Sequence, residues 1–129
     1  MTTWTNLIAI AGGGALGSVS RYFITLVAIA IPGGSSMLGT TIANVIGCAA
    51  LGGLIEYSAG EAILDERLRL ALQVGFLGSL TTFSTFSSES ASLAMDQRWL
   101  LTGLYLAANM VLGWAVLIGA AAVVKGWNA

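Results

Sequence analysis

Histidine is absent from the 129-residue sequence, and cysteine and proline occur once each. Without histidine, and with one thiol, the common hydrolytic and zinc chemistries have no residues to act through. The single cysteine, Cys48, lies within an apolar stretch, so the chain can form neither an intrachain disulfide nor a metal cluster built from thiols. We therefore expect that the protein is not an enzyme, and we expect no nucleic-acid partner.

Charged residues are also scarce, and their scarcity indicates whether the chain lies in water or in a membrane. Only 9% of the residues are charged and 57% are hydrophobic, a composition that cannot supply the polar surface of a soluble domain. The chain is therefore expected to be a multi-pass protein of the lipid bilayer. Four apolar stretches separated by short polar breaks predict a single all-α domain over residues 1–129, with transmembrane helices at about 7–31, 37–57, 68–95 and 99–124.

The lysine and arginine residues of the loops, which set membrane orientation, are nearly balanced. With four spans, both termini and the middle connection share one side of the membrane, and this side carries Arg67, Arg69 and Lys125. The opposite side carries Arg98. This weak bias leaves two alternatives open: one fixed orientation, or copies that insert both ways and pair antiparallel.

Glycine is abundant, with seventeen residues that fall mostly within the spans. Small and polar residues recur four apart, so that each set shares one helix face, as in Gly13-Gly17-Arg21, Asn44-Cys48-Gly52 and Tyr105-Asn109-Gly113. The glycines predict close helix packing. The polar members must face protein or water rather than lipid, and we treat Arg21, Asn44, Glu89 and Asn109 as functional candidates. The alternative for Arg21 is a side chain that reaches the membrane interface.

The stretch GFLGSLTTFSTFSSES, residues 75–90, is rich in hydroxyl groups although it lies inside an expected span. Its glycines and its serine and threonine residues weaken an α-helix, so we predict a break in the third span near residues 78–81. Beyond the break, Phe83 and Phe86 are three residues apart and share one helix face. The simplest interpretation of this pair is packing. Aromatic edges beside hydroxyl and amide donors also make a passage suited to an anion.

These residues carry a resemblance to a known family. The sequence GFLGSLTTFSTFS at 75–87 closely resembles the signature of the Fluc (CrcB) family of fluoride channels. GALGSVSRY at 14–22 is similar to that family's first-span motif, and GTTIANVIGC at 39–48 is similar to its second-span motif. The resemblance covers essentially the whole chain.

The resemblance implies an antiparallel, dual-topology homodimer in the cell inner membrane. Such a dimer conducts fluoride passively through two pores and reduces fluoride toxicity. By motif, the fluoride-binding residues are the pore phenylalanines, the pore asparagine, three members of a polar track and an arginine at the pore mouth, namely Phe83, Phe86, Asn44, Ser84, Thr85, Tyr105 and Arg21.

The resemblance also implies a structural sodium ion, Na+, at the dimer interface. Its ligands would be the backbone carbonyl groups of Gly78 and Thr81, and hard cations do prefer such oxygen ligands. The sequence departs from the family pattern at Ser79, where a second glycine is usual, so its Cβ narrows the backbone choice at this turn.

Three other classes of protein are weighed against a fluoride channel. A proton-coupled small multidrug exporter needs a membrane carboxylate early in the first span, where this chain has Arg21. A lipid kinase needs a phosphate-binding loop with lysine, and the acidic cluster of Glu61, Asp65 and Glu66 instead resembles a solvated helix start. A structural subunit remains an alternative.

For Glu89 we favour a structural role, with proton coupling and an interface position as alternatives.

Overall fold

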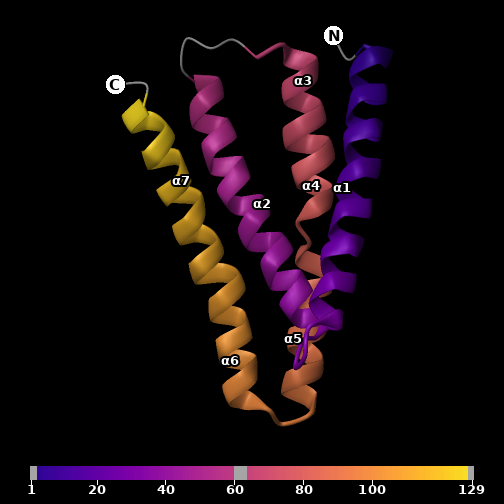
Figure 1. Ribbon diagram of the computed structural model, residues 1–129, viewed down its shortest axis with the longest axis vertical. Helices are drawn as coiled ribbons and strands as arrows, with labels where there is room; N and C mark the ends of the chain where they lie inside the picture. Colours follow the sequence, from indigo (N-terminus) through magenta and orange to yellow (C-terminus); the bar gives the residue numbers. More distant parts are fainter. Residues whose placement is uncertain (1–2, 60–63, 128–129) are drawn as a thin grey trace.

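A computed structural model describes residues 3–59 and 64–127, and every regular element within these two stretches is a helix (Figure 1). The elements are α1 (Trp4–Ala30), α2 (Ser36–Ala59), α3 (Glu66–Leu70), the π-helix η1 (Ala71–Leu77), α4 (Gly78–Leu80), α5 (Phe83–Met95), α6 (Trp99–Ala107), the π-helix η2 (Ala108–Leu112) and α7 (Gly113–Trp127). Glu61, one of the three acidic residues of the middle connection, lies outside the described residues. The predicted all-α, four-helix architecture is confirmed.

Three of the continuous helices are long and apolar enough to cross a membrane. They are α1, α2 and the helix formed by α6, η2 and α7 without interruption, with 27, 24 and 29 residues respectively. At about 1.5 Å per residue, each exceeds the thickness of a hydrocarbon core of about 30 Å. The third helical segment is interrupted at Thr81 and Thr82, so neither of its halves is long enough by itself. This interruption lies at the end of the interval in which a break was predicted.

The helices run up and down, so that α1 begins and α7 ends at the same end of the molecule (Figure 1). Helix α2 packs mainly against α7, and α1 packs against η1, α2 and α4. Few large side chains are buried in one chain, and the apolar side chains of α1 and α7 point mostly outward. This outward-facing apolar surface is what a lipid-exposed helical protein requires.

Glycines let the helix backbones approach closely, as the four-residue stripes predicted. A Cβ atom added at Gly13 would overlap the carbonyl oxygen of Ala71, and one added at Gly17 would overlap that of Phe76. On the other side of the bundle, a Cβ at Gly52 would overlap the carbonyl oxygen of Leu117. The close packing expected from the glycines is therefore confirmed at α1 against η1 and at α2 against α7.

The turn between α5 and α6 is a Schellman motif, which ends α5 sharply. Gln97 adopts a positive φ of 59°, its amide donates to the Ala94 carbonyl at 3.0 Å, and the Arg98 amide donates to the Leu93 carbonyl at 3.0 Å. This tight turn sends α6 back alongside α5. It thereby brings the polar face of α6 and η2 against α5 and α2.

Candidate functional site

The site is organised by the break between α4 and α5. Thr81 leaves the helix with ψ 152°, and Thr82 is extended with φ −147° and ψ 118°. The Thr82 side chain then caps α5, because its Oγ1 accepts a hydrogen bond from the Thr85 amide at 3.2 Å. The sequence TTFST therefore both ends one helix and begins the next.

Asn44 of α2 braces this break from across the bundle. Its Oδ1 accepts from the Thr82 amide at 2.8 Å, and its Nδ2 donates to the Thr82 carbonyl at 3.2 Å. Asn44 and Thr82 are both buried, and buried backbone groups without hydrogen-bond partners are costly in free energy. One side-chain amide thus satisfies both polar backbone groups of Thr82 where the helix cannot.

A second asparagine extends this network to α6 and η2. Asn44 Nδ2 donates to Asn109 Oδ1 at 2.8 Å, and Asn109 Nδ2 donates to Thr41 Oγ1 and to the Tyr105 carbonyl, each at 3.1 Å. Asn109 was a candidate from its place in an apolar span, but it was not among the expected pore residues. Thr41 and Thr82 were not singled out, although a threonine three residues before Thr85 is a recognisable capping pattern.

The two phenylalanines lie in different surroundings. Phe86 is buried and packs between two rings, with centroid distances of 5.8 Å to Phe83 and 5.5 Å to Tyr105 and interplanar angles of 57° and 49°. These tilted arrangements are the ones that aromatic pairs prefer. Phe83 is 75% exposed at the outer side of the same row. The Tyr105 hydroxyl donates to the Glu89 carboxylate, which continues the row along α5.

A cavity of about 240 Å³ lies at the break and brings together part of the expected pore set. Its lining includes the expected pore residues Asn44, Phe83 and Phe86 and the expected sodium ligand Thr81. It also includes Thr82, Asn109, Cys48 and Met110. The polar groups of this lining are uncharged, and they lie beside aromatic rings. Such an arrangement places polar groups along the cavity without a fixed positive charge that would retain an anion.

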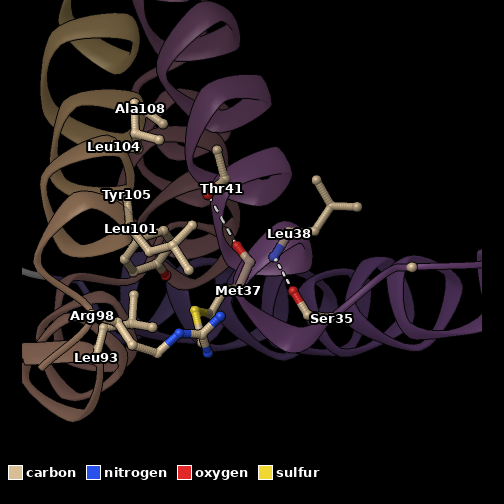
Figure 2. A pocket seen from close by; sticks show the side chains of 11 residues that line it. Ser35, Met37, Leu38, Thr41, Leu93, Arg98, Leu101, Leu104, Tyr105 and Ala108 are labelled. Carbon is tan, nitrogen blue, oxygen red and sulfur yellow. Dashed lines mark hydrogen bonds between the residues drawn. The ribbon is translucent and has the colours of Figure 1, made fainter. Parts of the chain in front are cut away.

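A larger cavity of about 560 Å³ lies between the start of α2, the end of α5 and α6. Figure 2 shows the labelled side chains of Thr41, Tyr105 and Arg98 around it. Thr41 and Tyr105 are also the partners of Asn109, which lines the smaller cavity. The two cavities are therefore linked through one side-chain amide.

The remaining expected pore residues lie around these cavities rather than in their linings. The Thr85 hydroxyl accepts from Thr82 Oγ1 at 3.0 Å, and the Ser84 hydroxyl lies 3.4 Å from the same oxygen. Arg21 lines neither of the two cavities, because its Nε donates to the Ser79 carbonyl of α4 at 3.1 Å. Its guanidinium group thus ties α1 to the turn that precedes the break.

The carbonyl groups of Gly78 and Thr81 do not accept the hydrogen bonds that they would accept in a continuous α-helix. The amide four residues after Gly78 belongs to Thr82 and donates to Asn44, and the amide four residues after Thr81 belongs to Thr85 and donates to Thr82 Oγ1. Neutral carbonyl oxygens released in this way are the kind of ligand that a hard cation takes. The residues present therefore fit a sodium ion.

Ser79 is compatible with this geometry, because it lies within the helical residues of α4. A helical residue tolerates a Cβ atom without strain. The Cβ that the sequence departure introduces is therefore accommodated in the backbone conformation found here.

Four apolar helical segments, one of them interrupted and braced by buried amides, define a small polytopic membrane protein with a polar and aromatic cavity at the helix break. The chain belongs to the CrcB family. The family model described as "CrcB-like protein, Camphor Resistance (CrcB)" matches residues 8–121.

Similar proteins in several bacteria are named as fluoride-specific ion channels FluC. The protein from Rhodopirellula baltica is 40% identical, with 99% of each chain covered. The one from Nitratidesulfovibrio vulgaris is 42% identical over 87% of this chain and 90% of the relative, and the one from Rhizobium johnstonii is 39% identical over 92% and 94%. None of these matches favours the multidrug exporter that the sequence left as an alternative.

Proposed function

We propose that this protein is a fluoride-selective channel that passively exports fluoride from the cytoplasm and so reduces fluoride toxicity. The observation that carries the proposal is the cavity at the helix break, where two phenylalanines meet neutral amide and hydroxyl groups. The relatives indicate which ion is conducted, because each is named a fluoride-specific ion channel. Passive conduction requires no catalytic group.

Selectivity for fluoride over other anions depends on the hydration of the ion. Fluoride is small and holds its water tightly, so a pore must offer donors at close spacing in place of that water. In this chain the donors would be the Asn44 amide, the hydroxyls of Ser84 and Thr85 and the phenol of Tyr105, while the positive edges of Phe83 and Phe86 bridge between them. The Tyr105 phenol donates to Glu89, so it would have to turn from the carboxylate to the ion. A narrow passage of this kind excludes larger anions.

Asn44 has a specific constraint in this mechanism. Both of its Nδ2 hydrogens are donated, one to the Thr82 carbonyl and one to Asn109 Oδ1. Donation to fluoride would therefore require the ion to replace one of these two acceptors. Because both acceptors are neutral oxygens, an anion competes with them favourably.

A pore of this kind is completed by a second copy in the antiparallel orientation. The strongest support is Phe83, whose ring is 75% exposed although it lines the cavity beside the buried Phe86. An inverted copy packed on this face would cover the ring and close the cavity. The nearly balanced charges of the two ends permit insertion both ways in the cell inner membrane.

The same dimer would hold the structural sodium ion. The carbonyls of Gly78 and Thr81 supply two oxygens from one chain, fewer than a hard cation usually takes, and a second copy would supply two more. When bound, the ion would neutralise the carbonyl dipoles at the break and fix the two copies together. Arg21, which holds the neighbouring Ser79 carbonyl, would keep α4 in place beside it.

Growth of a bacterium that lacks its own fluoride exporter tests the proposal. Fluoride enters cells as the neutral weak acid and dissociates inside, so a passive anion pore allows the membrane potential to drive it out. We expect that cells producing this protein grow at fluoride concentrations that stop cells with the empty vector. Equal sensitivity of both strains, with the protein present in the membrane, would contradict the proposal.

A further inference from the structure

The side-chain amide of Asn109 lies at the site, but the proposed pore assigns it no role. Asn109 is 9% exposed and lies in η2, where the last helix is locally wound as a π-helix. π-Helical turns of this kind are frequent at functional sites. Three of the four hydrogen-bonding positions of the amide are used, since Oδ1 accepts once and Nδ2 donates twice.

The partners of Asn109 determine which way its amide points. Nδ2 faces the Tyr105 carbonyl, which can only accept, and Thr41 Oγ1. The Thr41 hydroxyl hydrogen is donated to the Met37 carbonyl at 3.0 Å, so its oxygen is free to accept from Asn109. With Nδ2 fixed on this side, Oδ1 must point to the other side, toward Asn44.

Asn109 in turn provides the acceptor for one of the two Nδ2 hydrogens of Asn44. The Thr82 amide and carbonyl hold one edge of the Asn44 side chain, through Oδ1 and one Nδ2 hydrogen. The second Nδ2 hydrogen is donated to Asn109 Oδ1 at 2.8 Å. Four donations therefore run in one direction along the chain Thr82, Asn44, Asn109, Thr41, Met37.

From this ordered chain we propose that Asn109 is a positioning residue that orients the Asn44 amide and, through it, holds the Thr81–Thr82 break in its conducting shape. Asn109 acts on the anion through Asn44 and the break that Asn44 braces. Its loss leaves Asn44 held only by the Thr82 amide and carbonyl and lets the break relax, so the cavity admits larger anions. The effect on ion selection rests on the proposed function, whereas the orientation of Asn44 does not.

The orientation of Asn44 can be observed without any transport. The protein contains four asparagines, so labelling with ¹⁵N-asparagine in detergent gives few side-chain amide resonances, and Asn44→Leu assigns those of Asn44. We expect Asn109→Leu to shift the Asn44 side-chain resonances and to merge or broaden them. Thr102→Val is the matched control, because Thr102 is a buried polar residue on α6 whose hydroxyl bonds the Arg98 carbonyl and not Asn44. It should leave the Asn44 resonances in place.

Fluoride and chloride efflux from liposomes gives the second readout. We expect Asn109→Leu to lower the ratio of fluoride to chloride efflux at least about fivefold, and Thr102→Val to leave it unchanged. If Asn109 acts through Asn44, the double variant with Asn44→Leu should be no worse than Asn44→Leu alone. Should Asn109→Leu fail to fold, Asn109→Ser is used in the same two measurements, because its shorter side chain does not reach Asn44.

Unchanged Asn44 resonances in a folded Asn109 variant would overturn the proposal, as would independent effects that multiply in the double variant. If the wild-type protein carried no fluoride, the proposed function would fail on its own, and the resonances would still decide whether Asn109 positions Asn44. The two failures are therefore distinguishable.

Discussion

At the scale of single residues, the two phenylalanines of the proposed pore differ in exposure, because the Phe83 ring is exposed and the Phe86 ring is buried. Phe86 packs on Tyr105, whereas Phe83 is open to a partner. If their edges bridge the donors, Phe83→Ile and Phe86→Ile should each lower fluoride efflux from liposomes about tenfold, a change of about 1.4 kcal/mol in the barrier. Phe23→Ile, on the exposed face of α1, is the control and should conduct normally. Wild-type efflux from both pore variants would contradict the role of the rings.

Glu89 is held by the Tyr105 hydroxyl, which indicates the structural role that we favour for it. Glutamine keeps an oxygen that accepts this hydrogen bond and removes the charge, so Glu89→Gln should retain fluoride efflux within about threefold, less than 1 kcal/mol. Glu89→Ala, which leaves the hydroxyl without this acceptor, should be the weaker variant. The measurement is efflux with and without a pH gradient. A gradient that drives the wild type but no longer affects Glu89→Gln would instead show proton coupling.

At the scale of the helices, the contact of α1 with η1 depends on the absence of a side chain. Because a Cβ at Gly13 would overlap the Ala71 carbonyl oxygen, Gly13→Ala should force the two backbones apart and destabilise the fold by about 1–3 kcal/mol. Gly12 is its matched control, since nothing lies within 4 Å of an added Cβ there. Thermal unfolding in detergent should show a lower midpoint for Gly13→Ala and no decrease for Gly12→Ala. Equal midpoints would show that this contact is loose.

Much of the helix-scale architecture could be predicted from the sequence, for identifiable reasons. The hydroxyl-rich stretch with its glycines predicted an interruption, and the structure has it at Thr81 and Thr82, where the Thr82 cap restarts the helix. The two π-helical segments could not be predicted, because hydrophobic periodicity does not distinguish them from α-helix. Neither could the pairing of Asn44 with Asn109, which joins residues 65 positions apart and depends on how α2 meets η2.

The predicted site residues lie in different surroundings for the same reason. Asn44, Phe83 and Phe86 line one cavity together with Thr81. Arg21 bonds the Ser79 carbonyl instead of lining either cavity, because its place on α1 brings it against α4. A motif identifies residues that matter, but the direction of a long side chain is decided by the helix that packs beside it.

At the scale of the whole molecule, the proposed antiparallel pair predicts that activity depends on membrane orientation. Asp96→Lys, made together with Arg67→Gln and Arg69→Gln, leaves two basic residues at the α5–α6 turn against one at the opposite end, whereas Gly126→Lys gives that opposite end four against one. The two variants should therefore insert in opposite orientations. Either variant alone should fail to protect cells from fluoride, and the two produced together should restore protection. Full protection by either variant alone would contradict dual topology.

The most direct test of the account is fluoride efflux from liposomes that contain the purified protein. A potassium ionophore releases the membrane potential, a fluoride electrode follows the ion, and chloride is the control anion. The account predicts rapid loss of fluoride with chloride retained. No fluoride loss from liposomes in which the folded protein is inserted, or equal loss of both anions, would contradict it.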